Sequence, residues 1–214
     1  MTENIKEIQN QLQAAQKEKN IDQLIALHNE LLLNHTLDPL LPSILFNMGL
    51  FHLFESQRID LARDSFLVCT KLKHPDFLEK ARNFYAQCLI AEKKYEVALF
   101  ELKKNISKNP TSLETIATLR LMALVYEETQ NLPEYKKVFR EQESKIIQLL
   151  QTNPPIETVN LLQYELALNF LSTLRLFEAK QLLLRLQQYY QQSHSDLPIQ
   201  KSLQKLLDKI SSKP

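Results

Sequence analysis

The amino-acid sequence predicts an all-α protein built from consecutive antiparallel helix pairs. The 214 residues contain a single glycine, Gly49, whereas glycine averages about 7% of residues and supplies the positive-φ turns of hairpins and phosphate loops. The helix formers Leu, Gln, Glu and Lys dominate, and β-branched residues never form an alternating run. Small residues also recur at a fixed interval in successive amphipathic segments. These observations predict helices throughout the chain and no strands.

The repeating unit is clearest in KKYEVALFELKKNISKNP, residues 93–110. Tyr95, Ala98 and Leu102 are three and four residues apart, so they share one face of a helix, and Pro110 ends it. The preceding segment EKARNFYAQCLIAEKK also reads as an amphipathic helix, and its Ala86 lies twelve residues before Ala98. Small side chains let neighbouring helices approach closely, so we expect a helical hairpin here.

A similar spacing recurs in three other segments, with thirteen residues from Gly49 to Ala62 and twelve in each of the other two pairs. The second-helix positions of successive units are separated by 36, 37 and 44 residues, and a period of this length is typical of helical solenoids. In one unit a tyrosine takes the place of the second small residue. The pairs, with the repeats they define, are Gly49 and Ala62 (42–75), Ala86 and Ala98 (77–110), Ala123 with Tyr135 (113–152), and Ala167 and Ala179 (156–192).

Both ends of the chain also read as helices. Residues 5–36 read as a degenerate helical pair, with Ile21, Leu24, His28 and Leu31 on one face of its second helix. Residues 198–212 predict a C-terminal capping helix, because the terminal repeat of a solenoid otherwise leaves its apolar face in water. We therefore expect one domain spanning residues 1–214. The capping helix carries its apolar stripe on Leu203, Leu206, Leu207 and Ile210.

Residues 42–190 resemble the tetratricopeptide repeat family. The segments that carry the resemblance are LFNMGLFHLF…DLARDSF, FYAQCLIA…KKYEVALFEL…NP, RLMALVYEE…NLPEYKKVF and YELALNFLS…LFEAKQLLLRL. The family's tryptophan is absent, and its first-helix glycine survives only as Gly49. The resemblance implies a right-handed solenoid whose first helices line a concave groove that binds peptides or partner helices.

The family's groove positions in this chain are apolar at both ends of the array and polar in the middle. Helix-in-groove recognition would place apolar anchors of a partner there; alternatively, Phe46, Leu50 and Leu53 belong to the core. Co-chaperone members of the family grip an acidic C-terminal tail with Lys and Asn, where this chain has Phe46 and Leu50, so we expect no such clamp. The groove residues are Phe46, Leu50, Leu53, Phe54, Asn83, Gln87, Ile90, Arg120, Leu124, Glu127, Tyr164, Leu168 and Leu171.

Composition and spacing exclude several kinds of chemistry. The 26 basic and 25 acidic side chains are interspersed, so no extended positive field favours nucleic acid. One glycine cannot form a phosphate-binding loop. The five histidines lack metal-site spacing and are expected at the surface or its boundary, and Cys69 and Cys88 read as buried, unreactive thiols. We expect no catalytic residues, cofactor or metal.

The sequence favours a non-enzymatic protein-interaction module or adaptor in the cytoplasm. The polar amino terminus lacks an apolar signal region, and no window approaches the 18 or more apolar residues of a membrane span. A protein or peptide partner is expected, without nucleic acid or membrane insertion, and a homo-oligomer is compatible with the sequence. The alternatives are a secretion-type chaperone that holds an exported protein, a peptide-responsive regulatory sensor, and an enzyme with scattered active-site groups.

Overall fold

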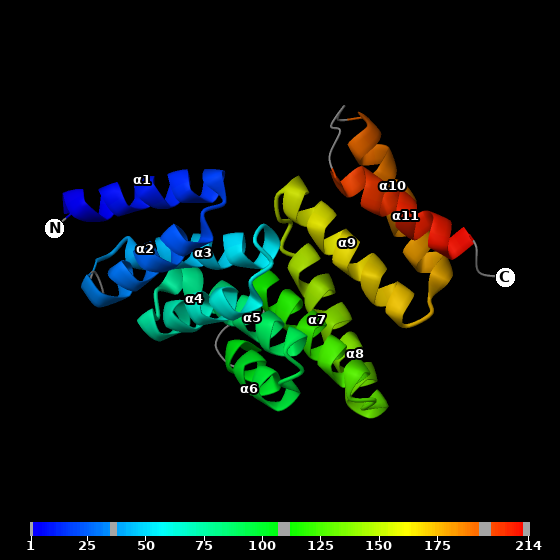
Figure 1. Cartoon of the computed structure of the whole chain (residues 1–214). Coiled ribbons are helices and arrows are strands. Elements are labelled where there is room, and N and C mark those ends of the chain that lie inside the picture. The colour runs from blue at the N-terminus through cyan, green and yellow to red at the C-terminus, as the bar shows by residue number, and fades with distance from the viewer. Residues whose placement is uncertain (1, 35–37, 107–111, 193–197, 212–214) are drawn as a thin grey trace. The chain divides into compact units, whose positions relative to one another are not determined.

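The computed structural model describes residues 2–34, 38–106, 112–192 and 198–211 (Figure 1). Throughout these residues the secondary structure is helical, without a strand, which confirms the all-α prediction. The chain divides into two compact units, Met1–Lys108 and Asn109–Pro214. Each unit is described by itself.

Unit 1 contains three consecutive helix pairs. Each of the predicted ranges 5–36, 42–75 and 77–110 holds two helices that contact each other, and α4 also packs against α5. Helices joined by so few residues must run antiparallel to pack side by side. The helices are α1 (Thr2–Glu18), α2 (Ile21–Asn34), α3 (Leu41–Phe54), α4 (Ile59–Leu72), α5 (Pro75–Ala91) and α6 (Tyr95–Ile106).

Unit 2 contains two helix pairs and a final helix. The ranges 113–152 and 156–192 each hold two helices in contact, α8 packs against α9, and α11 packs against α10. At 19 residues α8 is longer than any other described helix, which accounts for the 44-residue interval. The helices are α7 (Leu113–Glu128), α8 (Leu132–Leu150), α9 (Ile156–Ser172), α10 (Leu176–Gln192) and α11 (Pro198–Ser211). The right-handed superhelix of the tetratricopeptide family stays a prediction.

The apolar stripe of α11 covers the end of unit 2, as predicted. Leu203, Leu207 and Ile210 are buried in the same cluster as Leu183 and Leu186 of α10, and Leu206 packs against it partly buried. In the amino-terminal pair, Leu24, His28 and Leu31 are likewise buried. Both ends therefore close their neighbouring repeat with apolar side chains.

Small residues lie where consecutive helices meet. Ala62, Ala86, Ala98 and Ala179 have no exposed surface at all. A methyl side chain lets two helix backbones approach closely, and a larger one forces them apart. The small-residue spacing thus identified real helix contacts in both units.

The helices turn without glycine. Seven non-glycine residues in the described chain have positive φ: Lys19, Gln57, Lys73, Lys93, Gln130, Asn153 and Leu174. Helix C-termini commonly end in this left-handed conformation, and the next N–H then returns to a carbonyl of the last turn. Lys94 N donates to Leu89 O at 2.8 Å, and Arg175 N donates to Phe170 O at 2.8 Å. Six of the seven residues are polar, and Leu174 is the exception.

The expectation that the histidines lie at the surface or its boundary is wrong for two of the three that the structure describes; His35 and His194 lie outside the described residues. His28 of α2 is 6% exposed, and His52 of α3 is fully buried. The Nε2 atom of each ring is buried without a hydrogen-bond partner. Each ring occupies a position on the packed face of its helix, where its carbon atoms substitute for an apolar side chain.

Candidate functional site: the groove residues of each unit

The predicted groove residues of α3 lie in or against the core of unit 1. Phe46 is 8% exposed, and its ring lies 5.4 to 5.7 Å from the rings of Phe66, Phe77 and Phe84. Leu50 and Leu53 are partly buried against the same cluster, whereas Phe54 is 59% exposed. The core alternative weighed for Phe46, Leu50 and Leu53 therefore fits their positions.

The predicted groove residues of α5 are also buried or half-buried. Asn83 is 8% exposed, and its Oδ1 accepts a hydrogen bond from Asn105 Nδ2 of α6 at 3.0 Å. The same Nδ2 donates to the Glu79 carbonyl, and Arg82 donates to Asn105 Oδ1 at 2.8 Å. Asn83 thus belongs to a buried polar link between α5 and α6. Gln87 and Ile90 are half-buried.

Unit 2 presents its groove residues more openly. Arg120, Leu124 and Glu127 are exposed along one face of α7. On α9, spaced in the same way, Tyr164, Leu168 and Leu171 are half-buried. Spacings of four and three residues place each trio on one side of its helix. Unit 2 is therefore where apolar groove positions remain accessible.

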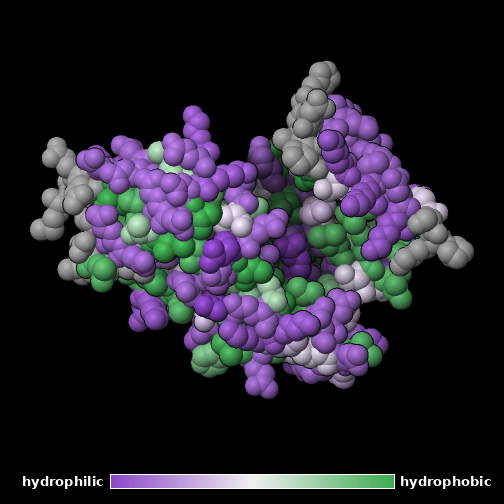
Figure 2. Space-filling model, in the orientation of Figure 1, coloured by the Kyte–Doolittle hydropathy of each residue, from purple (hydrophilic) through white to green (hydrophobic). Residues whose placement is uncertain are grey.

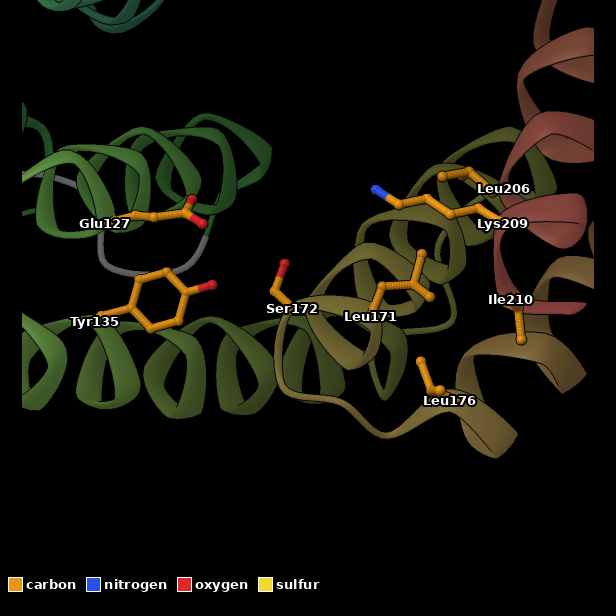
Figure 3. A pocket seen from close by; sticks show the side chains of 8 residues that line it. All are labelled: Glu127, Tyr135, Leu171, Ser172, Leu176, Leu206, Lys209 and Ile210. Carbon is orange, nitrogen blue, oxygen red and sulfur yellow. The ribbon is translucent and has the colours of Figure 1, made fainter. Parts of the chain in front are cut away.

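A cleft of about 300 Å³ opens beside these residues (Figure 3). We call it the α11 cleft, because α11 forms one wall and α7 with α8 the other. Figure 3 shows the Glu127 carboxylate and the Lys209 ammonium directed toward each other from opposite walls, with Ser172 and Leu171 on the helix that lies between the two walls. The lining residues are Glu127, Tyr135, Leu171, Ser172, Leu176, Leu206, Lys209 and Ile210.

The α11 cleft combines an apolar floor with a few polar groups. Burial raises the pKa of Tyr135, the Glu127 carboxylate raises it further, and a hydrogen bond with Ser172 opposes them. Tyr135 therefore stays a neutral phenol at neutral pH and offers a donor and an acceptor at the cleft wall. Such a mixture suits a ligand that buries an apolar group and aligns polar ones.

An ion pair joins the two groove helices of unit 2. Arg120 Nη1 lies 3.5 Å from Glu165 Oε1, and burial raises the pKa of Glu165 while the Arg120 charge opposes the rise. The other oxygen of Glu165 is buried without a hydrogen-bond partner. Arg120 therefore has a partner of its own on α9, although half of its side chain is exposed.

The α11 cleft lies at the repeat in which a large residue replaces the second small residue. Ala62, Ala98 and Ala179 occupy the second-helix position in the other repeats and are fully buried. In α8 this position is Tyr135, which cannot let the helices approach as closely and packs edge-on against Phe139 at 4.7 Å. A second cavity of about 500 Å³, lined by Tyr135 and Ser172 as well, lies against the turn between α9 and α10. The irregular repeat thus coincides with both cavities.

Buried amides hold α8 in place next to these cavities. Asn169 Nδ2 donates to the Phe139 carbonyl at 2.8 Å and to Gln142 Oε1 at 2.9 Å. Gln142 Nε2 in turn donates to the Ile116 carbonyl of α7 at 3.3 Å. Both amide side chains are 1% exposed. This chain of hydrogen bonds ties α7, α8 and α9 together, so the cavity walls are supported by buried polar contacts.

No protein-family model and no curated protein matches this chain.

The part of the chain described here contains no group of three or more His, Cys, Asp and Glu side chains placed to hold a metal ion. Burial raises the pKa of Cys69 to about 11 and, with the nearby Glu92 carboxylate, that of Cys88 to about 12. Both thiols are therefore protonated at neutral pH, as expected for packed cysteines. Among the described helices, none is long and apolar enough to cross a bilayer.

Several cleft residues were not predicted as groove residues. Leu206 and Ile210 were assigned to the cap alone, and Lys209 was not singled out. Their contribution depends on how α11 packs against α10, which no local pattern encodes. The signal that was available is Tyr135, the one large residue at a position that is otherwise small.

Proposed function

We propose that the chain is a non-enzymatic protein-interaction module that binds a peptide or helix of a partner protein in the α11 cleft and along the adjoining faces of α7 and α9. What supports the proposal is one observation. The C-terminal helix lines the cleft instead of filling it, and it leaves Glu127 and Leu171, two residues at groove positions of the family this chain resembles, facing open space.

The lining indicates what the partner segment contributes. Leu171, Leu176, Leu206 and Ile210 offer an apolar floor, which suits one or two aliphatic or aromatic side chains of a peptide. Glu127 and Lys209 carry opposite charges on opposite walls, so they fix the direction in which a segment with a basic and an acidic residue binds. The chaperone and sensor alternatives use the same groove and differ in the partner they hold.

The experiment selects peptides from a random library on the full chain and measures their affinity by fluorescence anisotropy. Leu124→Glu places a charge on the groove face of α7 one turn before Glu127. The matched control is Ile147→Glu on α8, since Ile147 is 44% exposed and Leu124 is 39% exposed. Neither side chain lines the cleft itself, but only Leu124 occupies a predicted groove position beside it. We expect the first variant to weaken binding at least tenfold and the control to bind like the original chain. Equal affinities of the two variants would overturn the proposal.

A further inference from the structure

The second cavity of unit 2 has a different chemistry from the α11 cleft. We call it the turn recess, because it lies between α8 and the turn that joins α9 to α10. Its volume is about 500 Å³. Its lining residues are Tyr135, Lys136, Phe139, Arg140, Glu143, Ser172, Thr173, Leu174 and Arg175.

Two cations of the turn recess are uncompensated. Arg175 donates to both oxygens of Glu143, at 2.8 and 3.0 Å, and its Nε donates to Glu178 at 3.0 Å. Glu143 is therefore neutralised within the wall. Lys136 and Arg140 are four residues apart on the same face of α8, are exposed, and form no ion pair with any described residue. The recess thus presents net positive charge.

Leu174 supplies an apolar edge beside these cations. It is 73% exposed and adopts φ 63°, a conformation that costs a branched aliphatic residue about 1 kcal/mol or more. The equivalent positive-φ positions in the other described turns hold Lys, Gln or Asn. These are polar side chains, which suit a turn at the surface. Nothing in the packing of the turn needs a leucine here, because most of its side chain contacts no protein atom.

We propose that the turn recess binds an acidic peptide segment that carries an aliphatic or aromatic anchor. The anchor lies on Leu174 and the Tyr135 ring, and the carboxylates of the segment pair with Lys136 and Arg140. A peptide fits better than nucleic acid, because Phe139 is 6% exposed and offers no open ring face for a base, and only two free cations face the recess. This inference goes beyond the groove proposal, since Lys136, Arg140 and Leu174 do not line the α11 cleft.

The test titrates the full chain with three fluorescent probes: a peptide of alternating Glu and Leu, the same peptide with Lys in place of Glu, and a single-stranded oligonucleotide. We expect the acidic peptide to bind and to bind more tightly at low salt. The double variant Lys136→Glu/Arg140→Glu should weaken it at least tenfold. Its matched control is Lys180→Glu/Arg185→Glu, which makes the same charge change on exposed positions of α10.

Leu174→Gly provides a second test, because glycine adopts positive φ without strain and removes the anchor. We expect this variant to bind the acidic peptide at least fivefold more weakly while unfolding at the same or a higher temperature. The proposal is overturned if the acidic peptide does not bind, if both double variants bind alike, or if the oligonucleotide binds more tightly and responds to the Lys136→Glu/Arg140→Glu change. The Leu124→Glu variant should still bind the acidic peptide. The experiment therefore distinguishes failure of the turn-recess proposal from failure of the groove proposal.

Discussion

Gly49 of α3 lies directly beneath the ring of Phe66 of α4. A Cβ atom placed on Gly49 would lie 2.6 Å from the ring carbon Cε1 of Phe66. The ring cannot move away easily, because it is fully buried, stacks on Phe84 at 5.2 Å and meets Phe46 edge-on at 5.7 Å. The only glycine of the chain is therefore required by packing, since its helical φ needs no glycine.

Gly49→Ala should destabilise unit 1 by about 1 to 2 kcal/mol. Overpacking of a filled core typically costs about 1 to 3 kcal/mol, and replacing glycine by alanine in a helix returns up to about 1 kcal/mol. Urea unfolding of the full chain measures the change. Phe66→Leu in the same background should recover part of the loss, because it removes the clashing ring atoms. A more stable Gly49→Ala variant would show that the ring gives way.

Leu50→Glu and Leu124→Glu should behave differently, although both occupy predicted groove positions. Leu50 packs against the aromatic cluster of unit 1, so a carboxylate there costs several kcal/mol of stability or becomes protonated. Leu124 is 39% exposed on α7, and its replacement should change the free energy of unfolding by less than about 1 kcal/mol. Thermal unfolding followed by circular dichroism compares the two. Similar losses in both variants would place Leu124 in a core.

Much of the fold could be predicted from the sequence, because helix contacts through small residues leave a local pattern. The spacing of Ala86 and Ala98 predicted the pair formed by α5 and α6. The apolar stripe that ends at Ile210 predicted that α11 packs on its neighbouring repeat. The burial of Phe46 could not be predicted in this way, since it depends on Phe66, Phe77 and Phe84 from two other helices.

The candidate site was predicted less completely. Glu127 and Leu171 follow from the family's groove positions, but Lys209 reaches the cleft only through the way α11 packs on its unit. The turn recess was missed because it depends on which cations already have partners. Arg140 and Arg175 look alike in the sequence, and only the ion pairs of Arg175 separate them. Charge pairing across helices is a tertiary property.

Acid should destabilise unit 1 through its buried histidines. Burial, together with the charges of His28 and Arg58 and against that of Asp60, lowers the pKa of His52 from 6.5 to about 4. Burial also lowers the pKa of His28, against the effect of Asp64. The unfolded chain then binds more protons, so stability is complete above pH 6.5 and is lost as pH falls toward 4. At about 1.4 kcal/mol per pKa unit, the shift at His52 alone lowers the free energy of unfolding by roughly 3 kcal/mol over this pH range.

Urea unfolding of the full chain at several pH values between 4 and 7 tests this dependence. His52→Gln removes the titrating group, keeps a similar volume and should flatten the pH profile. His74→Gln is the control for the substitution itself, since that ring is partly exposed and its Nδ1 accepts a hydrogen bond from Asp76 N at the start of α5. An unchanged slope in His52→Gln would contradict the account.

Both cysteines should be slow to react with thiol reagents in the native chain. Their side chains have no exposed surface, and burial raises the pKa of Cys69 to about 11 and of Cys88 to about 12, so very little thiolate forms at neutral pH. A chromogenic disulfide reagent at pH 8 should label neither thiol quickly, and both should react once the chain is unfolded in urea. Fast labelling of the folded chain would show that α4 or α5 opens readily.

Photo-cross-linking tests the central claim most directly. A peptide selected on the full chain is made with a photoreactive group at its apolar anchor, irradiated in the complex, and its attachment sites are found by mass spectrometry. The account predicts adducts on the α11 cleft, at residues such as Leu171 and Leu206, that disappear in Leu124→Glu and persist in Ile147→Glu. Adducts confined to the outer face of α10, or equal labelling of both variants, would contradict it.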